Sequence, residues 1–130
     1  MPTSKAVLDA SAVLALLGAE PGAEVVGDAV VAGAAISAVN LSETVAKLAD
    51  AGVPQAAVHQ VLDALALEIV DFTAELAYAA GHLRRSTRSA GLALGDRACL
   101  ALGQQVGLPV LTSDRRWSDV SLGVEVRQIR

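Results

Sequence analysis

Short, uniformly apolar runs alternate along this chain with longer stretches in which apolar residues recur at helical spacing. Uniformly apolar runs are typical of strands that are buried on both faces of a parallel sheet. Spaced apolar positions, such as Leu41, Val45 and Leu48, indicate the buried face of an amphipathic helix. Five strands are predicted, at Lys5–Leu8, Ala34–Ala38, Glu68–Asp71, Pro109–Thr112 and Val124–Ile129, the last of them at an edge.

Helix start and stop residues occupy the stretches between these strands. Helices are predicted from Asp9 to Leu17, from Pro21 toward Val31, from Asn40 to before Gly52, after Pro54 to about Leu65, from about Thr73 to Ser89, and from Asp96 to before Gly107. The alternation of strands and helices with short connections predicts a three-layer α/β/α sandwich around a mainly parallel sheet of about five short strands. At 130 residues, the whole chain (1–130) is expected to form a single domain.

The composition limits the classes of function. Hydrophobic residues make up 53% of the chain and aromatic residues only 2%, so few rings are available to stack on bases. The formal net charge of −4 argues against nucleic-acid binding by bulk positive charge, but it does not exclude a metal-dependent enzyme. The longest uncharged stretch, Ala98 to Ser113, contains two glutamines and a proline and is unsuited to crossing a membrane.

The N-terminal segment and the single cysteine bear on localisation. The apolar segment after Lys5 resembles a signal peptide, but Asp9 interrupts it at a cost of roughly 2.5–3.5 kcal/mol. Cys99 has no internal disulfide partner, which agrees with a reducing compartment. We therefore expect a cytoplasmic protein without a membrane segment, in which Cys99 is a small core residue.

Four acidic residues lie where a short apolar run gives way to a helix or turn. At least three of them fall at the carboxyl ends of predicted strands, the edge at which open α/β sheets bind ligands. Carboxylates gathered without basic partners repel one another, and a bound divalent cation is the simplest reason to keep them together. Oxygen ligands favour Mg²⁺ or Mn²⁺, whereas zinc is not expected because both histidines fall on predicted helix surfaces. The four residues are Asp9, Glu43, Asp96 and Asp114.

Each carboxylate also has an ordinary explanation. Asp9 and Asp96 are suited to helix caps or first-turn charges, which are worth about 0.3–1 kcal/mol. Glu43 is placed to complete a capping box with Asn40 or to pair with Lys47, and the fourth acid suits a turn. Asp9 argues most strongly for a bound ion, because a carboxylate in an apolar segment is costly unless a charged group binds it.

Four segments of the sequence resemble the acidic motifs of the PIN-domain nucleases. They are VLDASAVLALL, SAVNLSETVAKL, LGDRACLALG and VLTSDRRW, and their order, spacing and total length are similar to those of the VapC ribonuclease toxins. The resemblance covers essentially the whole chain and implies hydrolysis of RNA by a metal-activated water, with one or two Mg²⁺ ions. Asp9 and Asp96 are then direct ligands, Glu43 and Asp114 complete the catalytic acidic set, and Ser11 and Thr112 are hydroxyls beside the metal.

The resemblance also implies partners. The substrate would be RNA, and a cognate VapB-like antitoxin would wrap the toxin and place a basic residue in the acidic pocket. A homodimer is expected too, for which the apolar helices between Leu41 and Leu65 offer a surface. Asp119 is expected to be a surface residue of the terminal turn. Candidate contacts to RNA phosphates are arginines that could equally be solvated surface residues: Arg84, Arg85, Arg88, Arg97, Arg115 and Arg116.

Two other functions remain open from the sequence. A receiver-type signalling domain also gathers acids and Mg²⁺ at strand ends, but it needs paired acids after its first strand and a lysine at the end of a late strand. Here the late strand ends in Thr112, Ser113 and Asp114. The second is a catalytically silent PIN fold that acts only as an interaction module, against which the complete acidic set argues.

Overall fold

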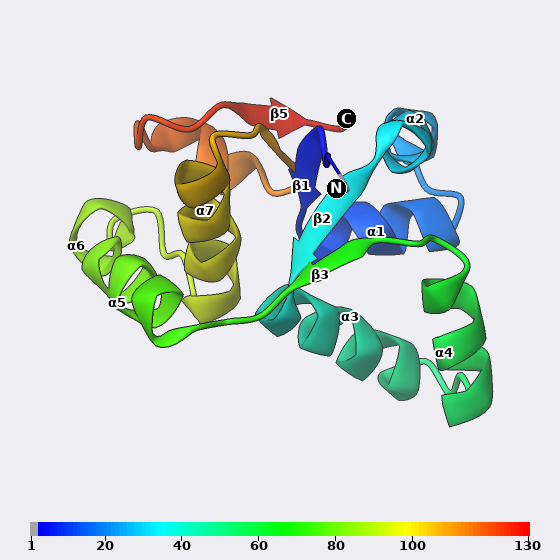
Figure 1. Ribbon diagram of the computed structural model, residues 1–130. Helices are drawn as coiled ribbons and strands as arrows, with labels where there is room; N and C mark the ends of the chain where they lie inside the picture. The colour runs from blue at the N-terminus through cyan, green and yellow to red at the C-terminus, as the bar shows by residue number, and fades with distance from the viewer. Residues whose placement is uncertain (1–2) are drawn as a thin grey trace.

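A five-stranded parallel sheet organises the chain in the computed structural model, which describes residues 3–130 (Figure 1). The strand order is β3-β2-β1-β4-β5, and every neighbouring pair is parallel. The sheet confirms the predicted α/β class and the edge position of the last strand. The strands are β1 (Ala6–Leu8), β2 (Ala34–Ser37), β3 (Glu68–Val70), β4 (Val110–Thr112) and β5 (Val126–Gln128).

Alternate strand residues supply two separate cores, one on each face of the sheet. Val7 and Val110 pack with Leu100 and Trp117 on one face, whereas Leu8 faces the opposite core. This alternation follows from the two-residue period of a strand. The inner strands β1, β2 and β4 are buried on both faces, which accounts for their mostly apolar sequences, whereas the edge strands β3 and β5 are only partly buried and contain charged or polar residues.

Helices from different parts of the chain cover the two faces (Figure 1). The C-terminal helices α5 (Ala74–His82), α6 (Arg84–Thr87) and α7 (Leu94–Val106) lie on one side of the sheet, and α1 (Ala10–Leu17) and α2 (Ala23–Ala32) lie on the other. Helices α3 (Ala38–Asp50) and α4 (Gln55–Asp63) contact each other beyond the end of the sheet, and α3 also packs against α7. A 3₁₀ helix, η1 (Arg115–Asp119), follows β4.

The predicted start of α3 is wrong. Ser37, the last residue of β2, is the N-cap, and its Oγ accepts a hydrogen bond of 3.2 Å from the Val39 amide. The helix therefore begins at Ala38, and Asn40 lies inside its first turn. Serine caps helices as well as asparagine does, so the two candidates compete, and the cap that directly follows the strand is used.

Three other helix boundaries also differ from prediction. Helix α2 begins at Ala23, because Gly22 adopts a left-handed conformation (φ 95°) that places Pro21 outside the helix. Helix α7 begins at Leu94, so that Asp96 lies in its first turn rather than at its start. The predicted helix from Thr73 to Ser89 is interrupted at Leu83, close to Gly81, a poor helix former.

Several residue-level predictions are confirmed. Cys99, on the buried face of α7, is a fully buried free thiol. Asp119 is exposed at the end of η1, and His59 and His82 are exposed on α4 and α5. Within residues 3–130, no helix has both the length and the apolar character needed to cross a membrane.

Candidate active site

Asp9 lies at the carboxyl end of β1, the central strand, where it caps α1. One carboxylate oxygen accepts hydrogen bonds from the Ala12 amide (2.8 Å) and the Ser11 hydroxyl (2.7 Å), and the other accepts one from the Thr112 hydroxyl (2.6 Å). The side chain is only 5% exposed, and none of its partners among the described residues is a cation. Burial raises the pKa of Asp9 to about 6, although the three hydrogen bonds oppose the rise.

The hydroxyls of Ser11 and Thr112 connect β1 to the end of β4. The Thr112 hydroxyl oxygen accepts a hydrogen bond from the Asp114 amide, and the Ser11 hydroxyl oxygen accepts one from the Ser113 amide, both at 3.0 Å. Each hydroxyl therefore donates to Asp9 and accepts from the turn after β4. This network places the first and last acidic segments side by side.

Asp114 follows β4 and forms the closest ion pair of the site, with Arg116. Arg116 donates to both Asp114 oxygens, with a shortest distance of 2.6 Å from Nη2 to Oδ2. The same guanidinium donates to the Gly91 carbonyl (3.0 Å) and lies 3.6 Å from Asp96 Oδ2. The hydrogen bonds from Arg116 hold the pKa of Asp114 below its usual range. Arg116 therefore bridges two members of the acidic set.

Asp96 lies in the first turn of α7, where its Oδ2 accepts a hydrogen bond of 2.9 Å from the Ala93 amide. This contact confirms the first-turn role that the sequence suggested. Burial raises the pKa of Asp96, and the neighbouring charge of Asp114 adds to the rise. The positive end of the helix dipole stabilises the Asp96 carboxylate, whereas partial burial leaves it short of solvent and favours a bound cation beside it.

Glu43 reaches the site from α3. Its carboxylate accepts a hydrogen bond of 2.8 Å from the Asn40 side-chain amide, so Asn40 binds Glu43 from within the helix and does not form the predicted capping box. The predicted ion pair between Glu43 and Lys47 is absent from the described salt bridges. Neither the capping box nor the ion pair with Lys47 is therefore confirmed for Glu43, although Glu43 does contact Asn40.

The four carboxylates line one pocket of about 200 Å³. Within residues 3–130, no three acidic, histidine or cysteine side chains come close enough together to enclose an ion by themselves. The donors are nonetheless all oxygens, and Mg²⁺ usually retains several waters, so the carboxylates fit a partly hydrated hard cation. The remaining lining residues are Ala10, Ser11, Leu14, Asn40 and Lys47.

The candidate phosphate-binding arginines divide into three groups. Only Arg116 contacts the acidic residues. Arg97 donates to the Ala80 carbonyl (2.9 Å), which ties α7 to α5, and Arg115 donates to the carbonyl of Arg130. The remaining three, Arg84, Arg85 and Arg88, are exposed on and just after α6.

Sequence reasoning paired Asn40 with Glu43 only as a capping box, and it gave Gly95 no role beside Glu43. Asn40 is 1% exposed and donates to both Glu43 and the Gly95 carbonyl, and Gly95 lies directly against the Glu43 carboxylate. The only sequence signal is a polar residue at a buried position of an amphipathic helix. The contact partner of Asn40 on α7 lies 55 residues away, so no local pattern indicates it.

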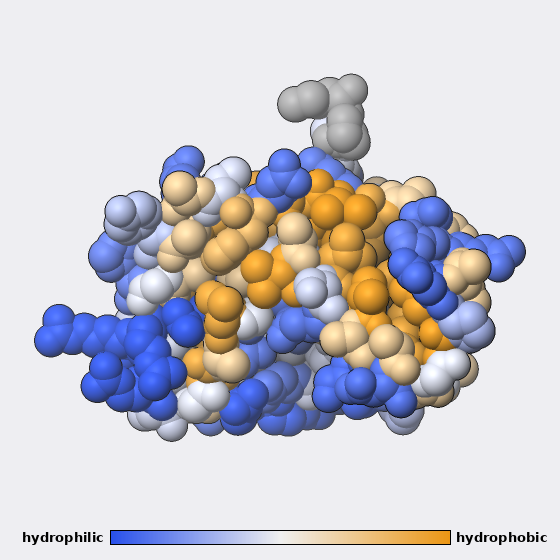
Figure 2. All heavy atoms as spheres, turned by 90° about the horizontal axis from the view of Figure 1, so that it is seen from below, coloured by the Kyte–Doolittle hydropathy of each residue, from blue (hydrophilic) through white to orange (hydrophobic). Residues whose placement is uncertain are grey.

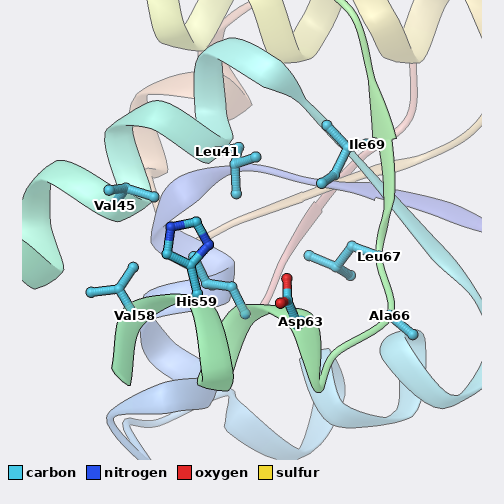
Figure 3. Close-up of a pocket in the computed structure, with 9 residues that line it drawn as sticks. Leu41, Val45, Val58, His59, Asp63, Ala66, Leu67 and Ile69 are labelled. Atoms are coloured by element: carbon cyan, nitrogen blue, oxygen red, sulfur yellow. The ribbon is translucent and has the colours of Figure 1, made fainter. Parts of the chain in front are cut away.

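A larger, apolar groove of about 310 Å³ lies between α3, α4 and β3. Figure 3 shows Leu41 and Val45 of α3 facing His59 of α4 across it, with Leu67 and Ile69 at one side. Figure 2, viewed from the side on which α3 and α4 lie, shows apolar surface across the middle of this face. The mainly apolar lining of the groove is suited to binding an apolar surface rather than to catalysis.

Comparisons with known proteins agree with this fold. The family model of the PIN domain matches residues 6–122. No curated protein matches the chain. Among solved structures, DNA-bound VapBC from Salmonella typhimurium superposes with a TM-score of 0.76 at 17% identity, covering 98% of this chain and 100% of that chain.

Two further structures are similar. A toxin–antitoxin complex from Klebsiella pneumoniae has a TM-score of 0.72 at 20% identity, covering 96% of this chain and 98% of that one. A member of the VapBC family of toxin–antitoxin systems from Mycobacterium tuberculosis has a TM-score of 0.59 at 21% identity, covering 97% and 98%. At these identities the likeness concerns the fold.

Proposed function

Because this chain belongs to the PIN-domain family, we propose that its acidic pocket is the active site of a Mg²⁺-dependent endoribonuclease, the toxin of a toxin–antitoxin pair. One observation carries the proposal: Asp9 is a buried carboxylate with three neutral donors and no cationic partner, and three further acids line the same pocket. A buried carboxylate that lacks a counter-charge is costly, and a bound cation offsets the cost.

The residues have separate roles in this proposal. Asp9 and Asp96 bind the ion directly, and Asp114 and Glu43 complete the site or hold its waters. When bound, Mg²⁺ neutralises the phosphate and lowers the pKa of the attacking water. Ser11 and Thr112 keep the Asp9 carboxylate in one orientation through their hydrogen bonds. The exposed arginines of α6 are suited to binding the RNA backbone away from the cleaved bond.

The first test is cleavage of single-stranded and structured RNA with Mg²⁺ or Mn²⁺, followed by EDTA. We expect cleavage that requires the metal and falls by at least about 100-fold in Asp9→Asn and Asp96→Asn, since each variant removes a proposed ligand. Asp119→Asn is the matched control, because Asp119 is an exposed acid outside the pocket. Metal-independent cleavage, or full activity in the two pocket variants, would refute the proposal.

The proposed protein partner is a VapB-like antitoxin that places a basic residue against the acidic pocket. The support is the acidic lining of the pocket and the similarity to structures of toxin–antitoxin complexes. Expression of this chain alone should arrest growth, and co-expression of a small neighbouring gene should relieve the arrest. Growth arrest by the Asp9→Asn variant would show that toxicity does not depend on the proposed metal-dependent cleavage of RNA.

We further propose that a second copy of the chain covers the apolar groove, giving a homodimer. Leu62 lines the groove on α4, so Leu62→Glu should shift the solution mass from dimer to monomer. Val31 is 90% exposed on α2 and outside the groove, which makes Val31→Glu the matched control. A dimeric Leu62→Glu variant that no longer binds the antitoxin would instead assign the groove to the antitoxin.

The two alternative functions are separated by the same measurements. Membership of the PIN-domain family excludes the receiver-type signalling domain. A catalytically silent interaction module would bind the antitoxin but would leave RNA intact under every metal condition, whereas the proposed toxin cleaves it.

A further inference from the structure

Asn40 connects the Glu43 carboxylate to the first turn of α7. Its Nδ2 donates to Glu43 Oε1 at 2.8 Å and to the Gly95 carbonyl at 2.9 Å. Both partners are acceptors, so only this orientation of the amide is compatible with them. The Oδ1 atom is left buried without a hydrogen-bond partner in the described chain. The orientation of the Asn40 amide therefore satisfies both acceptors and leaves its own Oδ1 atom without a hydrogen bond.

Gly95 provides the space that the Glu43 carboxylate occupies. A Cβ atom at position 95 would lie 2.1 Å from Glu43 Oε2 and 2.4 Å from its Cδ, far inside van der Waals contact. Gly95 is part of α7 and is not among the positive-φ residues, so the backbone itself does not require glycine there. Glycine in a helix is less stable than alanine, which leaves the carboxylate as the reason for its presence.

We propose that Asn40 and Gly95 are positioning residues that hold the Glu43 carboxylate beside Asp96 for metal binding. Asn40 fixes the direction of the carboxylate, and Gly95 allows it to approach the helix that carries Asp96. The inference rests on the proposed function for its catalytic consequence. The positioning itself can be measured without metal or RNA.

The main test compares two glycine-to-alanine variants. In Gly95→Ala the new methyl group displaces the end of a flexible side chain, so the fold should persist with an unchanged or higher Tm. Gly81→Ala is the matched control, because a Cβ at this helical glycine of α5 meets nothing within 4 Å. We expect Gly95→Ala alone to weaken Mn²⁺ binding and kcat by about 10–100-fold, the usual effect of losing a residue that orients a ligand.

A double-mutant cycle shows whether the effect passes through Glu43. In a Glu43→Ala background there is no carboxylate to displace, so adding Gly95→Ala should cause no further loss of Mn²⁺ affinity or kcat. Asn40→Ala should likewise weaken binding in the wild-type background and have little effect beside Glu43→Ala. If Asn40→Ala fails to fold, the glycine cycle decides the question alone.

An NMR measurement separates failure of this inference from failure of the proposed function. The Asn40 side-chain amide protons should exchange slowly with solvent in the wild-type protein and in Gly81→Ala, and faster in Gly95→Ala, where only the bond to the carbonyl of residue 95 remains. If the wild-type protein neither binds Mn²⁺ nor cleaves RNA, the proposed function fails, and this exchange difference still decides the positioning. If Gly95→Ala binds metal, cleaves RNA and protects Asn40 as Gly81→Ala does, the positioning role is overturned.

Discussion

Among the described residues, Arg116 is the cation that forms ion pairs with the acidic set. Its guanidinium occupies both Asp114 oxygens and lies 3.6 Å from Asp96, so a metal ion that uses Asp114 must compete with it. The side chain is half exposed, which leaves it free to turn away toward solvent or phosphate. Arg116 thus neutralises part of the acidic charge, and in the proposed metal site the ion would replace it at Asp114.

We expect Arg116→Gln to bind Mn²⁺ a few fold more tightly than the wild-type protein. An exposed ion pair is worth about 0.2–1 kcal/mol, so removing Arg116 as a competitor can increase the free energy of Mn²⁺ binding by no more than this amount. The KM for RNA should rise at the same time if the released guanidinium contacts phosphate. Isothermal titration and initial rates measure the two effects.

The control for this variant is Arg127→Gln. Arg127 lies in β5, pairs with Glu125 just before that strand, and does not line the pocket. It should change neither quantity. Weaker metal binding in Arg116→Gln would mean that Arg116 supports the metal site instead of competing with the ion.

At the scale of elements, α7 contains two buried glycines with different purposes. Gly95 faces a movable carboxylate, whereas a Cβ at Gly103 would lie 2.5 Å from the Val110 side chain of β4 and 3.0 Å from that of Val124. Val110 is a fully buried, β-branched core residue that cannot move aside. Gly103 therefore sets the distance between α7 and the sheet.

Gly103→Ala should destabilise the protein by about 1–3 kcal/mol, the usual cost of overpacking a core. Urea unfolding followed by circular dichroism measures the change, with Gly81→Ala as the reference for an alanine placed in an open helical position. Unfolding midpoints that are equal in the two variants would contradict the packing argument.

The elements also show what the sequence reveals and what it leaves hidden. Strand positions are predicted to within about two residues, and for the inner strands the reason is that burial on both faces imposes a local apolar pattern. The start of α3 is mispredicted because Ser37 and Asn40 are both good caps, and only the end of β2 selects between them. Asp9 is recognisable because it interrupts an apolar segment. Asn40 and Gly95 are not, since their purpose depends on how α3 packs against α7.

For the whole molecule, burial of Asp9 couples stability to pH. A carboxyl group whose pKa is higher in the folded state stabilises the fold at low pH, and this contribution is lost as pH rises from the ordinary value of 3.8 to about 6. The shift corresponds to about 3 kcal/mol. Without metal, wild-type protein should therefore lose stability over this range relative to Asp9→Asn, whose side chain does not titrate.

Urea unfolding in EDTA from pH 4 to pH 8 tests this expectation. Asparagine alters the hydrogen bonds of the site by a constant amount, so the informative quantity is the pH-dependent part of the difference between the two proteins. That difference should also shrink when Mg²⁺ is added at pH 7, because the ion stabilises only the wild-type carboxylate. A pH-independent difference would show that Asp9 does not titrate in this window.

The hydrogen bond from Thr112 to Asp9 spans 103 residues of the chain. A ribosome synthesises Asp9 103 residues before Thr112. Until β4 has been made, the hydroxyl that orients Asp9 and the turn that carries Asp114 are missing, although the other three acids all precede β4 in the chain. The pocket therefore cannot be assembled on a nascent chain that lacks β4, and a protein that cuts RNA in the proposed way could not attack the transcripts around it at that stage.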